Sequence, residues 1–137
     1  MKLKGILSVG FVFMSSLAQA EIVVSDAWVR LLPPTVKTTA AYLTINSDNE
    51  NTLVSVISPA ADRVEMHSST MNAGMMSMQQ VQVIGVSKDK PTILSPQGFH
   101  LMLIGLKHPT KEGESYPLTL VFEKGERIEV QALVTRR

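Results

Sequence analysis

Two histidines and two methionines stand at spacings that could bring four metal ligands together. Ten residues separate His67 from Met78, twenty-one separate Met78 from His100, and one separates His100 from Met102. The sequence contains no cysteine, so no thiolate ligand is available. Thioether sulfur combined with neutral imidazole favours Cu(I) over zinc or iron, because a soft ion prefers soft donors. The four residues therefore indicate a Cu(I) site in an oxidising compartment, where free thiolates are readily oxidised.

The second pair of candidate ligands lies on a predicted strand. Alternate residues of a strand share a face, so His100 and Met102 point the same way. The opposite face carries the large apolar residues Phe99, Leu101 and Leu103, which we expect in the core. His100 and Met102 should then face solvent or a shallow pocket.

The first pair of candidate ligands can meet across a hairpin. A four-residue loop over 71–74, ending in Gly74, would centre the hairpin between Asn72 and Ala73. That register sets His67 opposite Met78, with the two Cβ atoms about 5 Å apart. A turn centred one residue away would put the two side chains out of line and would refute this register. The resulting His2Met2 set disfavours zinc and excludes a blue-copper centre, which needs a cysteine thiolate.

Other methionines cluster around this hairpin. After removal of the leader described below, six methionines remain, and five of them lie within residues 66–78. Met66 should alternate away from His67 into the core. Met71, Met75 and Met76 fall at the predicted hairpin tip, where they could serve as auxiliary ligands or as a soft docking surface.

Three further side chains have less specific interpretations. His108 lies beside Pro109 and is expected to be a solvated loop histidine. Trp28, the single tryptophan, is expected to pack in the core. Glu65 shares a predicted face with His67 and could orient its imidazole. Because imidazole binds metal only when neutral, copper affinity should fall as the pH drops below about 6.5.

The first twenty residues have the features of a secretory signal peptide. Lys2 and Lys4 precede an apolar run over residues 5–14, and Ala18-Gln19-Ala20 provides a small-residue cleavage site. The alternative is a membrane anchor, but the apolar run is short for a bilayer span. We expect residues 1–20 to be removed and residues 21–137 to form one domain exported to the periplasm.

The mature domain would be close to neutral. Cleavage leaves 117 of the 137 residues and lowers Lys plus Arg from 13 to 11, against 12 acidic residues. A near-neutral surface has no general attraction for nucleic acid or for an anionic membrane. We therefore expect no binding to nucleic acid. We also expect a monomer that does not insert into a membrane.

Short strands separated by turn residues account for the mature sequence. The predicted strands are 22–31, 38–45, 53–57, 63–67, 75–84, 92–94, 99–106, 116–123 and 127–134. Pro, Gly and charged residues mark 32–37 and 107–115 as loops. Many closely spaced strands without helical periodicity predict an all-β sandwich or barrel.

The residues around the four candidate ligands resemble the PCuAC family of periplasmic copper chaperones. The family pattern is His, ten residues, Met, twenty-one residues, then His-x-Met, and His67, Met78, His100 and Met102 match every position. Flanking segments also match, at 27–30, 40–43 and 116–120. The resemblance covers nearly the whole mature chain.

This resemblance implies a cupredoxin-like, Greek-key-like β-sandwich that binds one Cu(I) ion at an exposed site. It also implies a role in supplying copper to the CuA centre of cytochrome c oxidase, directly or with a Sco-type thiol protein. A copper buffer or resistance protein of the same fold is the nearest alternative, because it differs only in lacking a dedicated acceptor. A copper redox enzyme fits less well, and no nucleophile–base pattern indicates another catalytic activity. We therefore expect a protein that is not an enzyme.

Overall fold

The computed structural model describes residues 5, 8–10, 12 and 21–137, so the expected signal peptide lies almost wholly outside it. Ten strands cover the described chain: β1 (Ile22–Arg30), β2 (Thr38–Ser47), β3 (Asn51–Ile57), β4 (Ala61–Asn72), β5 (Met75–Gln80), β6 (Ile84–Val86), β7 (Thr92–Ile93), β8 (Phe99–Leu106), β9 (Ser115–Phe122) and β10 (Arg127–Thr135). Within this part of the chain, no helix is long and apolar enough to cross a bilayer.

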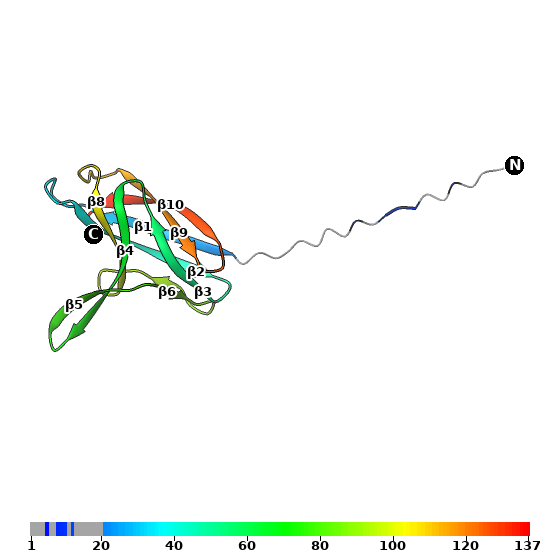
Figure 1. Ribbon diagram of the computed structural model, residues 1–137, viewed down its shortest axis with the longest axis horizontal. Coiled ribbons are helices and arrows are strands. Elements are labelled where there is room, and N and C mark those ends of the chain that lie inside the picture. Colours follow the sequence, from blue (N-terminus) through cyan, green and yellow to red (C-terminus); the bar gives the residue numbers. More distant parts are fainter. Residues whose placement is uncertain (1–4, 6–7, 11, 13–20) are drawn as a thin grey trace.

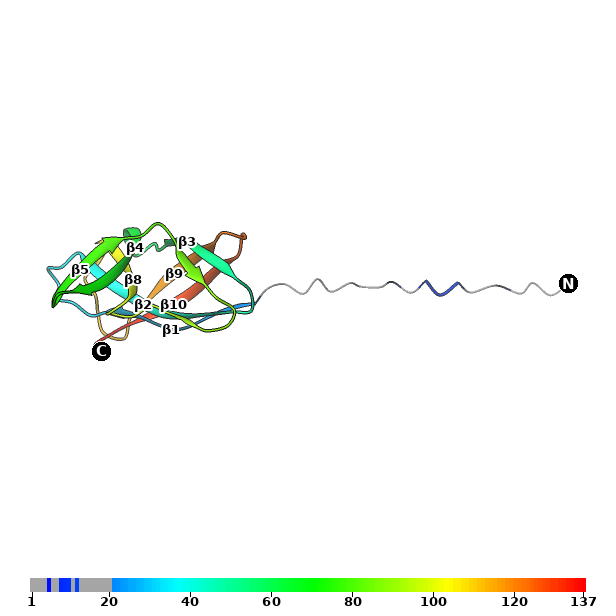
Figure 2. The same cartoon turned by 90° about the horizontal axis from the view of Figure 1, so that it is seen from below.

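The strands form one mixed sheet that curls around a common core. Its order is β5-β4-β8-β2-β1-β10-β9-β3-β6, with β7 paired to β2. β1 and β10 pair in parallel, whereas the other neighbours are antiparallel. The curl brings β6 against β2, far from it in the sheet order. In Figures 1 and 2, β3 and β4 form one layer and β1 and β10 the other.

Alternation along the strands builds the core between these layers. In β8, Leu101 and Leu103 are fully buried, and in β9 Leu118, Leu120 and Phe122 point the same way. Side chains from both layers join one hydrophobic cluster. The all-β, single-core fold expected from the sequence is therefore confirmed, as are the loops over 32–37 and 107–114.

One expected strand is in fact two. The sequence predicted a continuous strand over 75–84, but β5 ends at Gln80 and β6 begins at Ile84. The two pieces belong to opposite edges of the sheet, because β5 pairs with β4 and β6 pairs with β3. The backbone turns between them, where the Val81 amide donates to the Met66 carbonyl at 2.9 Å.

A bulge in β1 determines where the single tryptophan lies. The pairing of β1 with β2 shifts between Ser25 and Trp28, and Asp26 adopts a positive φ of 50°. An extra residue in a strand reverses which face the following residues occupy. Trp28 consequently lies opposite Tyr42, away from the main core, and is only 7% exposed there.

Candidate metal centre

Three of the four predicted ligands share one face of β4 and β8. The antiparallel register sets His67 opposite His100 and Glu65 opposite Met102. Directly opposed residues point to the same side of a sheet, and so do residues two apart on one strand. The two imidazole rings are stacked, with centroids 5.9 Å apart and planes inclined by 27°. The strand pairing thus brings together residues that are 33 positions apart in the sequence.

The predicted hairpin register is wrong. β4 and β5 pair Ser69 with Met78 and His67 with Gln80. The turn is the two-residue Ala73-Gly74, with φ of 53° and 79°, as in the type I′ turn whose twist suits a hairpin. The hairpin centre therefore lies one residue beyond the predicted position, and the pairing moves by two.

Met78 nevertheless stays on the face of His67, because a shift of two residues preserves strand alternation. The two side chains are diagonal neighbours instead of direct opposites. Diagonal pairs in a sheet have Cα atoms about 7–8 Å apart, a distance that long side chains can bridge. All four predicted ligands consequently lie on one face of β5, β4 and β8.

This face opens into a hollow of about 390 Å³. Met78, His100 and Met102 line the hollow, while His67 lies beside it with its ring stacked on His100. Exposure differs strongly among them, since His100 is 3% exposed and Met78 is 57% exposed. The expected shallow pocket is thus present, although the His100 ring is buried at its base.

Hydrogen bonds fix the orientation of both imidazoles. His67 Nε2 donates to Glu65 Oε2 at 2.9 Å, and His100 Nδ1 donates to the Gly98 carbonyl at 3.1 Å. These bonds leave Nδ1 of His67 and Nε2 of His100 with free lone pairs. The hydrogen bond from His67, together with one from Arg63, lowers the pKa of the Glu65 carboxyl below its usual range. A charged acceptor behind a metal-binding histidine is a recurrent arrangement in metal sites.

The aromatic rings of Tyr42 and Trp28 extend across the sheet from His100 and form an aromatic wall. The Tyr42 ring lies 6.4 Å from His100 and 4.6 Å from Trp28, centroid to centroid. Met102 packs against the cluster formed by Trp28, Ala40 and Tyr42. The Arg30 guanidinium lies 5.5 Å from the centre of the Tyr42 ring. Burial raises the pKa of the Tyr42 hydroxyl. His100 is therefore buried and Met102 is half-buried beside this wall, while Met78 remains accessible.

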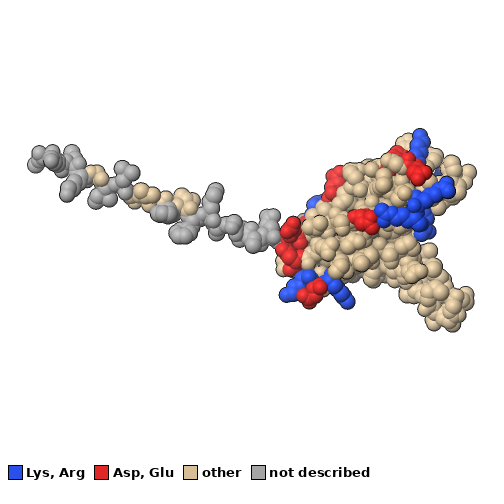
Figure 3. Space-filling view, turned by 180° about the vertical axis from the view of Figure 1, so that it is seen from behind, with Lys and Arg blue, Asp and Glu red and all other residues tan. Residues whose placement is uncertain are grey.

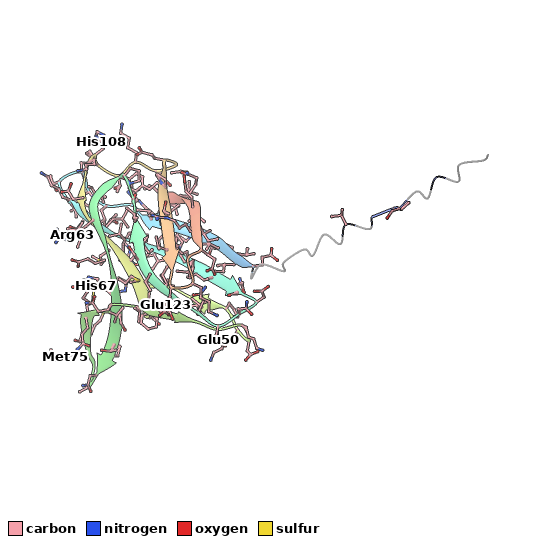
Figure 4. All side chains as sticks on the ribbon, turned by 45° about the vertical axis from the view of Figure 1, so that its right-hand side comes forward. Glu50, Arg63, His67, Met75, His108 and Glu123 are labelled. Atoms are coloured by element: carbon pink, nitrogen blue, oxygen red, sulfur yellow. The ribbon has the colours of Figure 1, made fainter. Side chains whose placement is uncertain are left out.

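Three other residues considered from the sequence lie apart from this hollow. Met66 is 6% exposed and belongs to the main core, as predicted. His108 is exposed in a loop at the opposite end of the domain from the hairpin (Figure 4). Phe99 was expected in the core but is 37% exposed, because it begins β8 beyond the edge of the core. Among the described residues, no three His, Cys, Asp or Glu side chains converge into a harder-ligand metal site.

Comparison with known proteins then identifies the family. Residues 22–134 match the family model described as "Putative lipoprotein LpqE-like". The chain belongs to the LpqE-like family. A relative of this LpqE-like chain, "Putative lipoprotein Lxx21020" from Leifsonia xyli subsp. xyli, is 30% identical over 105 residues, which cover 74% of this chain. The chain spans about 62% of the length of that relative.

Solved structures similar to this LpqE-like chain confirm the resemblance to PCuAC domains. The solution structure of CuI-DR1885 from Deinococcus radiodurans is 33% identical, with a TM-score of 0.67 over 84% of this chain and 78% of that one. The copper-bound PCuAC domain from PmoF2 is 21% identical, with a TM-score of 0.69 over 85% of this chain and 93% of that one. The latter likeness establishes the fold.

Sequence reasoning missed parts of the LpqE-like site that depend on strand order. Tyr42 and Trp28 join the site only because β2 and β1 follow β8 in the sheet. Met76, expected near the hairpin tip as an auxiliary ligand or part of a docking surface, lines the same hollow as Met78. Alternation along 76–78 could have placed Met76 on that face. The face of β1 on which Trp28 lies, in contrast, depends on a bulge that no sequence pattern indicated.

Proposed function

We propose that this protein is a periplasmic Cu(I) metallochaperone that holds one ion with His67, Met78, His100 and Met102. The supporting observation is the strand register, which gives these four side chains a common face beside one hollow. Two thioethers and two neutral imidazoles suit a soft monovalent ion. The hydrogen bonds at Glu65 and Gly98 leave one free nitrogen on each imidazole to face copper.

The unequal exposure of the ligands supports delivery as well as storage. Buried His100 and half-buried Met102 would form the stable side of the site, and exposed Met78 would form the open side. An acceptor ligand can then bind copper before the Met78 sulfur leaves. Because neutral thioethers hold Cu(I) less tightly than thiolates do, transfer to a cysteine-bearing acceptor would be downhill.

Relatives support the choice of cargo. DR1885 has been solved with Cu(I), and a PCuAC domain from PmoF2 has been solved with copper. We propose the same cargo here, and an acceptor such as the CuA centre of cytochrome c oxidase, reached directly or through a Sco-type protein. This acceptor follows from the PCuAC resemblance. In this role the protein is not an enzyme.

The proposed location is the periplasm, after cleavage of residues 1–20. The family and its curated relative carry the description lipoprotein. The 137 residues contain no cysteine to which a thioether-linked lipid could be attached. We propose that residues 21–137 act in the periplasm.

The metal site is tested by a Cu(I) competition titration of residues 21–137 under reducing conditions. The parent should bind one tight equivalent, and the double variant M78L/M102L should lose it. Leucine keeps the volume of methionine, so the fold should persist in the double variant. M75L is the matched control, because Met75 lies on the other face of the hairpin. Equal binding by parent and double variant would contradict the proposal.

A copper buffer would pass this titration too, so delivery needs its own experiment. The copper-loaded protein is mixed with a reduced dithiol acceptor, and the copper content of each is measured after separation. Transfer faster than spontaneous release into a small-molecule chelator supports a chaperone. Transfer limited by spontaneous release would favour the buffer instead.

A further inference from the structure

The β4–β5 hairpin carries far more exposed methionine than the proposed site uses. Met71 is 67% exposed, Met75 75% and Met76 57%. No Lys, Arg, Asp or Glu occurs in residues 66–87. The hairpin extends from the body (Figure 1), and its visible face is free of charged side chains (Figure 3). Thioethers are therefore the main soft, metal-binding groups on this projection.

Strand alternation divides these methionines between the two faces of the hairpin. Met71 is directly opposite Met76, and the pair lies on the same face as Ser69 and Met78. Met75 is opposite Asn72 and consequently points the other way. Met76 also lines the hollow that contains Met78, His100 and Met102. Three thioethers thus follow one face from the hairpin tip to the proposed site.

We propose that Met71 and Met76 form an outer Cu(I) site that exchanges its ion with the inner site through Met78. This inference rests on the proposed function of the inner site. Directly opposed side chains have Cβ atoms about 5 Å apart, so two flexible thioethers can hold one ion between them. Two thioethers and a solvent molecule are fewer and weaker donors than His2Met2, so the outer ion is held less tightly.

The transfer step needs only ligand exchange. Met76 and Met78 are two residues apart on β5, a rise of about 7 Å along the strand. Each methionine has three rotatable side-chain bonds, so the sulfur of Met78 can approach an ion on Met76. A Cu–S bond to Met78 forms as the bond to Met71 or Met76 breaks, and copper remains Cu(I) throughout.

Occupancy of the outer site is tested by NMR of the methionine methyl groups during a titration with Ag(I), a redox-inert soft ion. The first equivalent should shift Met78 and Met102, and the second should shift Met71 and Met76 while Met75 stays unchanged. A second equivalent that shifts no methionine, or shifts Met75 equally, would overturn the outer site. Shifts confined to Met71 and Met76 from the start would uphold the outer site and overturn the inner one.

The kinetic role is tested with M71L/M76L, again with M75L as the matched control. Loading of the inner site from a Cu(I)–chelator complex should slow about tenfold in M71L/M76L, because an ion held nearby has a high effective concentration. M71L alone leaves every residue that lines the hollow in place, so it should also slow loading while the equilibrium affinity of the inner site stays unchanged, which separates this result from failure of the proposed function. Parent-like loading, or slowing that M75L reproduces, would overturn the relay.

Discussion

The hydrogen bond between Glu65 and His67 gives a quantitative test of how the imidazole is held. Glu65 Oε2 accepts from His67 Nε2 at 2.9 Å, and Oε1 accepts from Arg63 Nε at 3.1 Å. Glu65→Gln keeps the shape of the side chain and removes its charge. The bond to His67 then becomes a neutral one, which is roughly half as strong as a charge-assisted bond. We expect the His67 ring to sample both tautomers and several orientations.

The structure sets the size of the effect. Removing the hydrogen-bond partner of a metal-binding histidine costs about 10–100-fold in metal affinity. The Glu65 side chain is 22% exposed, so water can replace part of the lost interaction. The amide oxygen of Gln can still accept a hydrogen bond. For both reasons, E65Q should lose about tenfold in Cu(I) affinity, at the lower end of the 10–100-fold range.

The assay is a competition titration against a chromophoric Cu(I) chelator at pH 7, with nitrogen-15 NMR reporting the His67 tautomer. E112Q, in the exposed loop before β9, controls for the loss of one negative charge. Parent-like affinity in E65Q would refute the orienting role of Glu65. A loss of about a thousandfold, beyond the range for a supporting residue, would instead mean that Glu65 binds copper itself.

Three other perturbations test the supporting structure. L101A removes a fully buried side chain of β8 and should lower the free energy of unfolding by about 2–5 kcal/mol in urea denaturation; a loss under about 1 kcal/mol would contradict this packing. Cu(I) loading should change the Trp28 fluorescence, because Met102 packs against the cluster that contains Trp28. M102L should abolish this change. The absence of any fluorescence change in the parent protein would count against Met102 as a ligand. G105A and G113A both force alanine into a positive φ, which costs about 1–2 kcal/mol of folding free energy each. Only at Gly105 would the added Cβ also collide with the Asp62 side chain, so G105A should lower the melting temperature more than G113A does. Equal lowering by the two variants would be inconsistent with the structure.

The alternation of side chains along one strand could be predicted from the sequence, whereas the pairing of strands with one another could not. The alternation of residues 99–103 correctly separated Leu101 and Leu103 from His100 and Met102. It failed for Phe99, because the core ends before that residue. Tyr42 lies next to His100 because β2 follows β8 in the sheet, and Trp28 stacks beside Tyr42 because of the bulge in β1. Sheet order is a long-range property that periodicity within one strand does not encode.

The hairpin shows why an incorrect register still gave the correct face. Placing Ala73 in the left-handed region costs about 1–2 kcal/mol, so a longer loop ending in Gly74 was the natural prediction. The protein adopts the two-residue turn, whose twist matches that of the paired strands. The pairing moved by two residues, and Met78 therefore kept its side of the sheet. A shift of one residue would have turned Met78 away from both histidines.

The most direct test of the proposed copper site is X-ray absorption spectroscopy of the protein loaded with one equivalent of Cu(I). Coordination by His67, Met78, His100 and Met102 predicts two nitrogen and two sulfur neighbours. The sulfur contribution should be retained in M75L and in M71L/M76L, and lost when M78L/M102L is added to M71L/M76L. A copper ion with no sulfur neighbours, or with sulfur neighbours that disappear in M71L/M76L, would contradict the four-ligand site.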